Sequence, residues 1–472
     1  MQQKLQRILA CPLCNVANPK LEKLTCNTCK AAFFELNEIP CFFPSGTNQL
    51  HLWNHLLAMF IEEGSNTAKT LTEELNKKNI SSLTKQRLSN TLKIHNASHA
   101  HLVKLLQQAG LKPQFNDDYK NYSTKVFSKY HELPLKDWAW FSEPAGRFSY
   151  GDSLHDENRL AMDHITNLIN SVRNDEQKEC RILVIGAGAG RLSWDLHCAL
   201  RPSMTIAMDF NPLLSFLSKS LINDGNTIEW HEKIDFPQQQ LPQLHKWQLK
   251  CPKSGPQLHQ SWIPILADAW AMPFVPHSFD YVITPWFIDV MNQDCKRLIA
   301  QLDKMLKPGG FWVNYGPFLY NENLVDSAKY TSEEIKELLT LSHFTFINET
   351  TTQTPYSCSP VNKCGRIEQV WGMISRSPPD RKHMESISSF VGPIDSQQRP
   401  PWLVMPHLPI PLLMSTCAIP EALTNIANLI DGKRSINEIV TLLAPLLPDG
   451  YSGEDIFYDF LYEYFSSSQF TN

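Results

Sequence analysis

The stretch Arg181-Ile-Leu-Val-Ile-Gly-Ala-Gly-Ala-Gly-Arg-Leu192 decides the fold of this 472-residue chain, because a glycine-rich segment follows an apolar run without a break. The apolar run predicts a buried strand, and the residues after the glycines predict a helix. Side chains are absent at Gly186, Gly188 and Gly190, so a ligand can approach the backbone and the helix can begin close to the sheet. The stretch therefore predicts an α/β fold with a nucleoside-cofactor site at this turn.

A second apolar run, Ile206-Ala-Met-Asp209, ends in a carboxylate. A carboxylate at the tip of the neighbouring strand can accept hydrogen bonds from both hydroxyls of a ribose. Nicotinamide and flavin enzymes share this glycine pattern, and many tight turns bind nothing. The first two motifs therefore leave the identity of the cofactor open.

Three later segments narrow the choice of cofactor. They are Pro264-Ile-Leu-Ala-Asp-Ala-Trp-Ala-Met-Pro-Phe274, Ser278-Phe-Asp-Tyr-Val-Ile-Thr-Pro-Trp-Phe-Ile-Asp289 and Leu306-Lys-Pro-Gly-Gly-Phe-Trp-Val-Asn314. Their order resembles that of class I S-adenosylmethionine-dependent methyltransferases. The resemblance implies a Rossmann-like sheet, with Asp268 accepting a hydrogen bond from the adenine amino group. The cofactor-binding set that it implies is Gly186, Ala187, Gly188, Gly190, Arg191, Asp209, Asp268, Ala269 and Thr284.

Two of these regions resemble the carnosine N-methyltransferase family, which methylates an imidazole nitrogen of histidine-containing dipeptides. The resemblance lies in Phe287-Ile-Asp289 and in Asn314-Tyr-Gly-Pro-Phe-Leu-Tyr320. This chain has Asn321 where the family has a histidine, which leaves the exact acceptor open. A later tyrosine, Tyr356, matches the family only by rough position. The resemblance thus implies a catalytic set of Asp289, Tyr320, Asn321 and Tyr356.

Asp289 has a physical role in such a reaction. One nitrogen of a neutral imidazole must face the methyl group, and the N–H of the other needs a partner that fixes the tautomer. A carboxylate meets that need and stabilises the imidazolium that develops. The alternative is that Asp289 caps a helix beginning near Val290, since aspartate is a favoured N-cap.

Four cysteines form two Cys-x-x-Cys pairs, Cys11 with Cys14 and Cys26 with Cys29. Two such knuckles supply the tetrahedral sulfur shell that Zn²⁺ prefers, and four protein ligands leave no open position for water. The pattern therefore predicts a structural zinc ribbon. It resembles the small zinc-ribbon domain of a methyltransferase-activating subunit and of some bacterial methyltransferases. Cys41 is expected to be a core thiol.

The chain is too long for one ordinary domain. Histidines at positions 95, 99 and 101 lie in a Leu- and Lys-rich segment with helical spacing, and we expect them on a solvated helix face. The sequence predicts five regions: a zinc ribbon at 1–46, a helical region at 47–145, the methyltransferase domain at 146–376, a linker at 377–400 and a small helical or winged-helix domain at 401–472.

In the last region, Ser435 and Glu438 follow an Asp-Gly turn, which predicts a capping box at a helix start. The surrounding run resembles peptide-binding chaperone domains of ribosomal-peptide modification pathways, and winged helices appended to some methyltransferases. That resemblance implies peptide or protein docking through this region. Lys433 and Arg434 make a small basic surface among many acidic residues, which argues against nucleic-acid binding.

The net charge of −5 gives no global attraction to nucleic acid or to an anionic membrane. The N-terminus lacks an apolar signal core, and no apolar segment has the length that crosses a bilayer. Of the 12 cysteines, four are explained by the metal set and the others are scattered. These features predict a cytoplasmic protein, and they are compatible with a homodimer.

Three functions follow from these observations. The favoured one is an N-methyltransferase acting on an imidazole of a small molecule or peptide. The second is a nucleic-acid methyltransferase, for which Thr284-Pro-Trp286 resembles the polar-Pro-Pro-aromatic motif of amino-group methyltransferases, although the second proline is missing. The third is a non-enzymatic adaptor that retains the cofactor fold, against which the intact glycines and both acidic residues argue.

Overall fold

The computed structural model describes residues 3–12, 21–22, 24–43, 47–115, 157–173, 179–234, 242–251, 256–291, 294–320, 324, 326–356, 366–379, 410, 412–413, 419–446 and 453–464. The chain divides into two compact units. The first contains residues 1–114 and 134–387, and the second contains 115–133 and 388–472. We describe each unit by itself.

The first unit is built on a central sheet. Its strands among the described residues are β3 (Phe34–Leu36), β4 (Ile39–Cys41), β5 (Arg181–Ile185), β6 (Met204–Asp209), β9 (Trp262–Leu266), β10 (Phe279–Pro285), β11 (Leu306–Gly316), β12 (Thr345–Tyr356) and β13 (Arg366–Arg376). They lie in the order β12-β13-β11-β10-β5-β6-β9-β4-β3. Strands β11, β10, β5, β6 and β9 are parallel, whereas β13 is antiparallel to β11 and β12. The expected Rossmann-like α/β sheet is therefore present.

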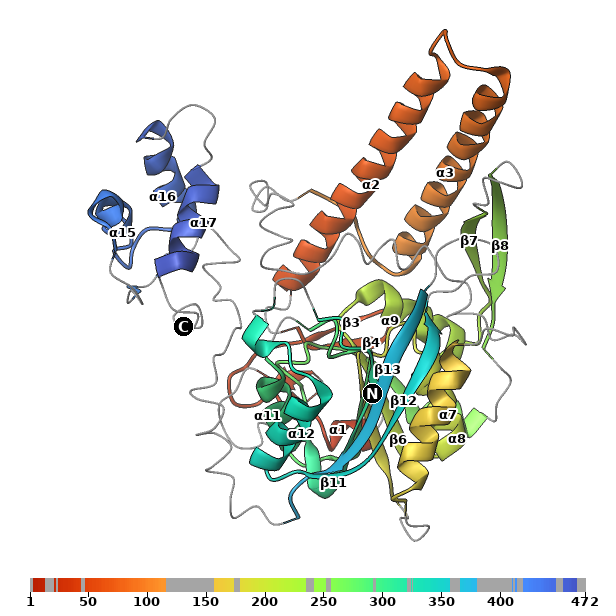
Figure 1. Cartoon of the computed structure of the whole chain (residues 1–472), viewed down its shortest axis with the longest axis vertical. Helices are drawn as coiled ribbons and strands as arrows, with labels where there is room; N and C mark the ends of the chain where they lie inside the picture. Colours follow the sequence, from red (N-terminus) through yellow and green to blue (C-terminus); the bar gives the residue numbers. More distant parts are fainter. Residues whose placement is uncertain are drawn as a thin grey trace. The chain divides into compact units, whose positions relative to one another are not determined.

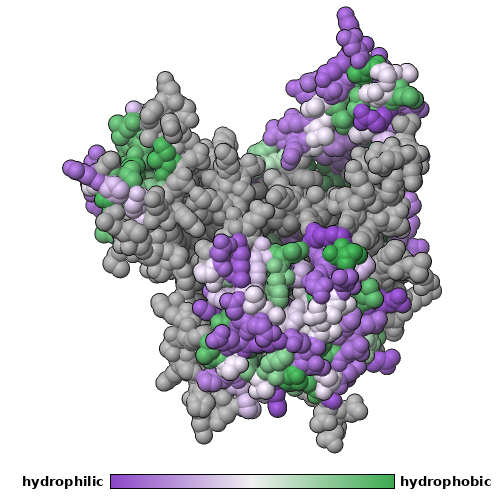
Figure 2. Space-filling view, in the orientation of Figure 1, coloured by the Kyte–Doolittle hydropathy of each residue, from purple (hydrophilic) through white to green (hydrophobic). Residues whose placement is uncertain are grey.

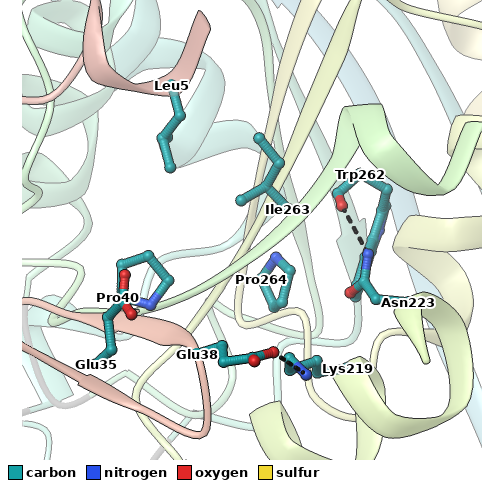
Figure 3. Close-up of a pocket in the computed structure, with 9 residues that line it drawn as sticks. All are labelled: Leu5, Glu35, Glu38, Pro40, Lys219, Asn223, Trp262, Ile263 and Pro264. Carbon is teal, nitrogen blue, oxygen red and sulfur yellow. Dashed lines mark hydrogen bonds and ion pairs between the residues drawn. The ribbon is translucent and has the colours of Figure 1, made fainter. Parts of the chain in front are cut away.

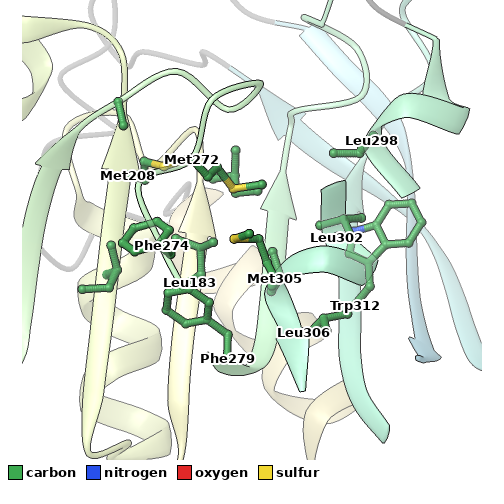
Figure 4. Close-up of a cluster of buried hydrophobic side chains, with 14 of the residues drawn as sticks. Leu183, Met208, Met272, Phe274, Phe279, Leu298, Leu302, Met305, Leu306 and Trp312 are labelled. Carbon is green, nitrogen blue, oxygen red and sulfur yellow. The ribbon is translucent and has the colours of Figure 1, made fainter. Parts of the chain in front are cut away.

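Helices cover both faces of the sheet (Figure 1). Alternate residues of β5 point to opposite faces, as the pleat requires. Ile182 and Val184 pack with α7 (Glu157–Asn170) and α8 (Arg191–Leu200). Leu183 and Ile185 belong to the other core, with α11 (Cys295–Met305) and α12 (Ser332–Leu341). Figure 4 shows this second core, in which Leu298 and Leu302 of α11 lie near Trp312. A strand buried on both faces explains the continuous apolar run in the sequence.

The order of the strands determines where a ligand can bind. From β5 the chain passes to β6 and β9 on one side, and then to β10 and β11 on the other. The topological switch point therefore lies between β5 and β10. Open α/β sheets bind ligands outside the carboxyl ends of the strands at such a point. The glycine turn after β5 and the segment after β10 both lie there.

The N-terminal segment is joined to this sheet. Residues 3–43 contain α1 (Gln3–Gln6), the small hairpin of β1 (Leu21–Glu22) with β2 (Thr25–Cys26), and β3 with β4. Strand β4 pairs with β9 in parallel, with Cys41 opposite Leu266. The cysteine-bearing segment thus extends the sheet. The sequence contained no signal for this pairing.

Two long helices follow, α2 (Thr47–Leu75) and α3 (Ser82–Gln108), and they form an antiparallel pair. Within the predicted helical region of residues 47–145, α2 and α3 are helical, while residues 116–145 lie outside the described part of the chain. A hairpin of β7 (Ile228–Ile234) and β8 (Gln243–Leu249) lies near α3. The unit also contains the short helices α9 (Pro212–Ser218), η2 (Lys219–Asn223), α10 (Pro256–Ser261) and η3 (Asp326–Ala328).

The expectation of a solvated face for the three histidines of α3 is wrong. Each ring is half-buried, and its Nε2 lies at hydrogen-bond distance from a backbone carbonyl. His95 and His99 bond to the carbonyls of Gly64 and Ile61 in α2, at 2.6 and 3.1 Å. His101 bonds to the carbonyl of Glu229 in β7 at 2.7 Å. The histidines therefore join α3 to its neighbours.

The second unit is helical where it is described. It contains η4 (Glu421–Leu423), α15 (Thr424–Ala427), α16 (Ile436–Leu443), η5 (Ala444–Leu446) and α17 (Gly453–Tyr464). The capping box is confirmed, since Ser435 caps α16 and Glu438 returns a carboxylate oxygen to the Ser435 amide at 2.8 Å. Residues 410–464 show no strand in their described part, as the helical alternative predicts. The exact boundaries of the five predicted regions remain predictions.

None of the described helices combines the length and the apolarity that a bilayer crossing requires. On the visible face, the coloured surface mixes hydrophilic residues with smaller apolar patches (Figure 2).

Candidate functional site

The glycine turn has a backbone that other residues adopt with difficulty. Gly186, Gly188 and Gly190 have φ values of 71°, 58° and 87°. In this left-handed region a side chain costs energy, and glycine does not. The turn is anchored to the neighbouring strand, because the amides of Gly186 and Ala187 both donate to the carbonyl of Met208. The turn thus presents bare backbone at the carboxyl end of β5.

Gly190 also permits close packing. A Cβ at this position would lie 2.7 Å from the Cβ of Ser218 and 3.0 Å from a ring carbon of Trp262. These residues come from α9 and β9, and helix α8 starts directly after Gly190. The third glycine therefore lets α8 begin against the sheet, as the sequence predicted.

Asp209 lies at the tip of β6, next to the turn. Its Oδ2 accepts a hydrogen bond from the Gly188 amide at 2.7 Å, and its Oδ1 accepts one from the Asn211 amide at 2.8 Å. The side chain is 9% exposed. Burial raises the pKa of Asp209, although these amide hydrogen bonds act in the opposite direction. Hydroxyl donors of a bound ribose would stabilise the ionised form.

Asp268 follows β9 and is half-buried. Its Oδ1 accepts a hydrogen bond from the Trp270 amide at 2.9 Å. Burial raises the pKa of Asp268, while the Trp270 amide and the positive charge of Arg297 lower it. Arg297 lies 5.1 Å from the ring centroid of Trp270, and Trp270 lies 6.2 Å from Phe287. A Cβ on Gly186 would lie 3.3 Å from the Phe287 ring, so Phe287 links this loop to the glycine turn.

Phe210 is a candidate site residue that sequence reasoning missed. It directly follows Asp209, is 41% exposed, and lies 5.8 Å from the ring of Trp53 in α2. A large exposed aromatic ring beside a buried carboxylate can pack on the face of a nucleobase. The available signal was an aromatic residue directly after the acidic strand tip, but its contact with Trp53 joins segments that are far apart in the chain.

Three of the expected cofactor residues have other contacts. Arg191 is buried, and its Nε donates to Asp195 Oδ2 at 2.6 Å. The Thr284 side chain has no exposed surface; its hydroxyl donates to Asn314 Oδ1 at 3.0 Å and accepts from the Trp312 indole at 2.8 Å. Ala269 packs against the core. The side chains of Arg191 and Thr284 therefore have partners within the protein, and Ala269 contributes to the core.

Asp289 lies where β10 and β11 end. Its Oδ1 is buried, and a Cβ on Gly316 would lie 3.4 Å from that oxygen. Gly316 also lets the backbone of Trp286 approach closely, because the same Cβ would meet the Trp286 nitrogen at 3.2 Å. The structure thus brings together the two segments that sequence analysis assigned to the acceptor.

The N-cap alternative for Asp289 is wrong. Residues 286 and 288–290 form turns, and helix α11 begins at Cys295. The N-cap of that helix is Asp294, whose carboxylate accepts from the Lys296 amide at 2.8 Å. Its other oxygen accepts from the hydroxyl of Tyr330 at 3.1 Å. Asp289 therefore does not cap α11.

Trp286, three residues before Asp289, belongs to an aromatic cluster. Trp286 has a left-handed backbone with φ of 46°, which is rare for a bulky residue and is found at functional sites. Its indole donates to Glu368 Oε2 at 2.8 Å. Its ring lies 5.7 Å from the ring of Tyr356, which is 4% exposed and lies under the guanidinium of Arg366. Tyr356 is thus part of the aromatic cluster of Trp286, and its role at the acceptor site stays a prediction.

Of the other two predicted acceptor contacts, Tyr320 donates its hydroxyl to the carbonyl of Tyr330. Burial raises the pKa of Tyr320 well above its ordinary value, so the hydroxyl stays protonated. Its contacts tie the loop after β11 to the start of α12. Asn321 lies outside the described residues.

Three of the four predicted zinc ligands lie together. The sulfurs of Cys11, Cys26 and Cys29 are all within 4.8 Å of one another, and the Cys11 and Cys29 sulfurs are 3.7 Å apart. The amides of Thr28 and Cys29 point to the Cys26 sulfur at 3.4 and 3.5 Å, as in a metal-binding knuckle. This donor set fits Zn²⁺. Cys14 lies outside the described residues.

A second group of metal-ligand side chains is formed by His101, Glu229 and His231, whose ligand atoms lie within 4.8 Å. The two imidazole rings stack at 4.0 Å. His231 Nε2 is 2.7 Å from Glu229 Oε1, and Lys246 Nζ is 3.1 Å from the same oxygen. The lysine charge already neutralises the carboxylate and opposes a cation there.

A pocket of about 360 Å³ lies between the cysteine-bearing segment and β9 (Figure 3). Two of its charged groups pair with each other, since Lys219 Nζ lies 2.9 Å from Glu38, and the same lysine lies 2.9 Å from Asp224. Asn223 donates to the carbonyl of Trp262 at 3.3 Å. Trp262 begins β9, so this pocket lies away from the carboxyl ends of the strands, where Asp209 and Asp268 are found.

Residues 149–365 match the family model of carnosine N-methyltransferases, which is less than half of the chain. A carnosine N-methyltransferase of Dictyostelium discoideum is 28% identical over 197 residues, which are 39% of this chain and 41% of that protein. That of Rattus norvegicus is 25% identical over 186 residues, covering 35% and 43%. The chain therefore spans less than half of the length of these relatives.

Among solved structures, magnesium protoporphyrin IX methyltransferase of Synechocystis PCC 6803 is 12% identical, with coverage of 56% of this chain and 98% of that one and a TM-score of 0.33. A methyltransferase of Methanosarcina mazei is 15% identical, with coverage of 43% and 95% and a TM-score of 0.30. These scores are low, and the fold assignment rests on the strand order described above.

Proposed function

We propose that this chain, whose residues 149–365 match the carnosine N-methyltransferase family model, is an S-adenosylmethionine-dependent methyltransferase that methylates an imidazole nitrogen of a histidine-containing small molecule or peptide. The observation that carries the proposal is the position of Asp289. Its buried carboxylate oxygen lies over Gly316, at the strand ends that also carry the glycine turn. An imidazole held there would lie between a carboxylate and the cofactor side of the sheet.

S-adenosylmethionine, when bound, supplies a methyl group activated by a positive sulfonium. Asp209 would accept hydrogen bonds from the ribose, Asp268 would accept one from the adenine amino group, and Phe210 would pack on the base. Their positions beside bare backbone at Gly186 and Gly188 fit this ligand.

The chain's own residues then account for the transfer. In the proposed transfer, the lone pair of one imidazole nitrogen would form the new N–CH₃ bond, and the electrons of the S–CH₃ bond that breaks would stay on the sulfur. The methylated ring would carry a positive charge until the proton on its other nitrogen is released to solvent. Asp289 would accept a hydrogen bond from that N–H, which orients the ring and stabilises the developing charge. The aromatic cluster of Trp286 and Tyr356 would exclude water from one side of the acceptor ring.

The test is a methyl-transfer assay with labelled cofactor against carnosine, other histidine dipeptides, histidine-containing peptides and total RNA. Label in an imidazole pool supports the proposal. Label only in RNA would support the nucleic-acid alternative instead. Cofactor binding without any transfer would support the adaptor.

The affinity for S-adenosylmethionine is expected to fall on acidification. Burial raises the pKa of Asp209 in the free protein, and ribose hydroxyls bind the ionised form better. Binding therefore competes with a proton, and the dissociation constant should rise as the pH falls through this raised pKa, beginning above the ordinary carboxyl range. Calorimetry measures this dissociation constant at pH values from 8 down to the lowest pH at which the protein stays folded. The Asp209→Asn variant should bind more weakly at pH 8 and lose part of the pH dependence, because Asp268, whose pKa burial also raises, remains; an equally steep dependence in that variant would assign all of it to another group.

We also propose that Cys11, Cys14, Cys26 and Cys29 hold a structural zinc ion, and that the purified protein carries about one zinc per chain. The Cys26→Ala variant is expected to lose this zinc, because one of four thiolates is removed. Cys41 is a matched control. It is 1% exposed, and burial raises the pKa of its thiol to about 12, so it should not ligate metal and Cys41→Ala should keep the zinc. The zinc content of both variants, measured by elemental analysis, distinguishes a zinc ribbon from a set of free thiols.

Three predictions from the sequence remain proposals: docking through the C-terminal unit, homodimerisation and a cytoplasmic location.

A further inference from the structure

The N-terminal segment contacts both ends of the loop that carries Asp268. At the far end of the loop, Leu9 pairs with Phe274 in an antiparallel bridge. The Ala10 amide donates to the carbonyl of Pro273 at 2.9 Å, and the Val275 amide donates to the carbonyl of Ile8 at 2.8 Å. The two hydrogen bonds of this bridge thus fix the chain just after the loop.

At the near end, β4 pairs with the last residue of β9. Cys41 lies opposite Leu266, and the Phe42 amide donates to the Leu266 carbonyl at 2.7 Å. Leu266 lies two positions before Asp268. Without β4, β9 would be the edge strand of the parallel sheet, with its outer hydrogen-bonding groups exposed.

The loop itself, residues 267–272, has few other backbone anchors among those described. The Ala267 amide donates to the Asp209 carbonyl at 3.0 Å, and the Ala271 amide donates to the Asp268 carbonyl at 3.1 Å. The flanking apolar side chains are shared with the N-terminal segment. Leu9, Phe42 and Phe274 are at most 2% exposed and lie in one core. Figure 4 shows Met272 and Phe274 in this core.

We propose that residues 8–10 and 41–42 act as a clamp that positions Asp268 for recognition of the adenine amino group, so that cofactor selectivity depends on the N-terminal segment. Cys11 directly follows the clamp, and folding of the ribbon around its cysteines is therefore coupled to the cofactor site. Because coupling between two sites is reciprocal, cofactor binding stabilises the clamp. This inference rests on the proposed cofactor.

The first experiment uses the wild-type chain and S-adenosylhomocysteine as the probe. Hydrogen exchange is expected to slow at the amides of Ala10 and Phe42 as well as at residues 267–272 when the probe binds. Protection of the glycine turn and the loop without any change at residues 8–11 and 41–43 would overturn the clamp. Absence of binding altogether would instead overturn the proposed cofactor.

The second experiment separates positioning from general stability. Ala10→Pro removes the amide that bonds to Pro273, and Glu38→Gln is the control, because it breaks an ion pair of the same segment whose carboxylate is 82% exposed. Two probes are compared: S-adenosylhomocysteine, and S-inosylhomocysteine, which lacks the amino group that Asp268 would bind.

Ala10→Pro is expected to weaken the binding of S-adenosylhomocysteine about 10-fold, which corresponds to one lost hydrogen bond. The affinity for S-inosylhomocysteine should change by less than about 3-fold. Glu38→Gln should leave both affinities unchanged. An equal loss for the two probes in Ala10→Pro would mean that the segment only stabilises the fold, and unchanged affinities would mean that the loop holds its own position. If the proline variant does not fold, the exchange experiment decides alone.

Discussion

Replacing Asp289 by asparagine is expected to lower the rate of methyl transfer to a histidine dipeptide about 100-fold. The amide keeps the size of the side chain and one hydrogen bond, but it removes the negative charge that stabilises the developing imidazolium. Binding of S-adenosylmethionine should be unchanged, because Asp209 and Asp268 are intact. The measurements are kcat with labelled cofactor and the cofactor dissociation constant by calorimetry.

Asp294 provides the matched control for this substitution. It lies five residues away, and it caps α11 and accepts from Tyr330. Asp294→Asn is expected to cost about 1 kcal/mol of stability through the weakened cap and to leave kcat within a few-fold. If both variants lose activity equally, the loss reports damage to the loop, and the assignment of Asp289 to the acceptor is wrong.

Replacing Gly190 by alanine is expected to destabilise the fold by about 2–4 kcal/mol, from a left-handed backbone and from overpacking. The added carbon would lie 2.7 Å from Ser218 and 3.0 Å from Trp262, and neither neighbour can move without displacing α9 or β9. Thermal unfolding should show a fall in Tm of roughly 10 °C. Cofactor binding should be lost as well, because α8 would be pushed away from the turn.

A substitution at Gly225 measures the loss of stability that comes from the left-handed backbone alone. Its φ of 66° is also left-handed, but a Cβ there would meet nothing within 4 Å. Gly225→Ala should therefore cost about 1 kcal/mol and leave cofactor binding intact. A similar Tm for the two alanine variants would show that the packing around Gly190 relaxes easily.

The sequence by itself determined the strand, turn and helix at residues 181–200 and the placement of Asp209 and Asp268 at neighbouring strand ends. These features follow from local patterns, in which a run of buried residues stops at glycine or at a carboxylate. It also determined the capping box at Ser435, because that motif lies within four residues. Local patterns of this kind need no knowledge of the fold.

Only the tertiary structure decided which of these residues meet. It set the burial of Thr284 against Asn314, the bond from Trp286 to Glu368, the contact of Phe210 with Trp53, and the joining of β4 to β9. It also removed Asp289 from the start of α11, where sequence alone left the cap and the site equally open. Each of these outcomes depends on the pairing of strands or on packing between distant segments, and one sequence contains no direct signal for such pairings.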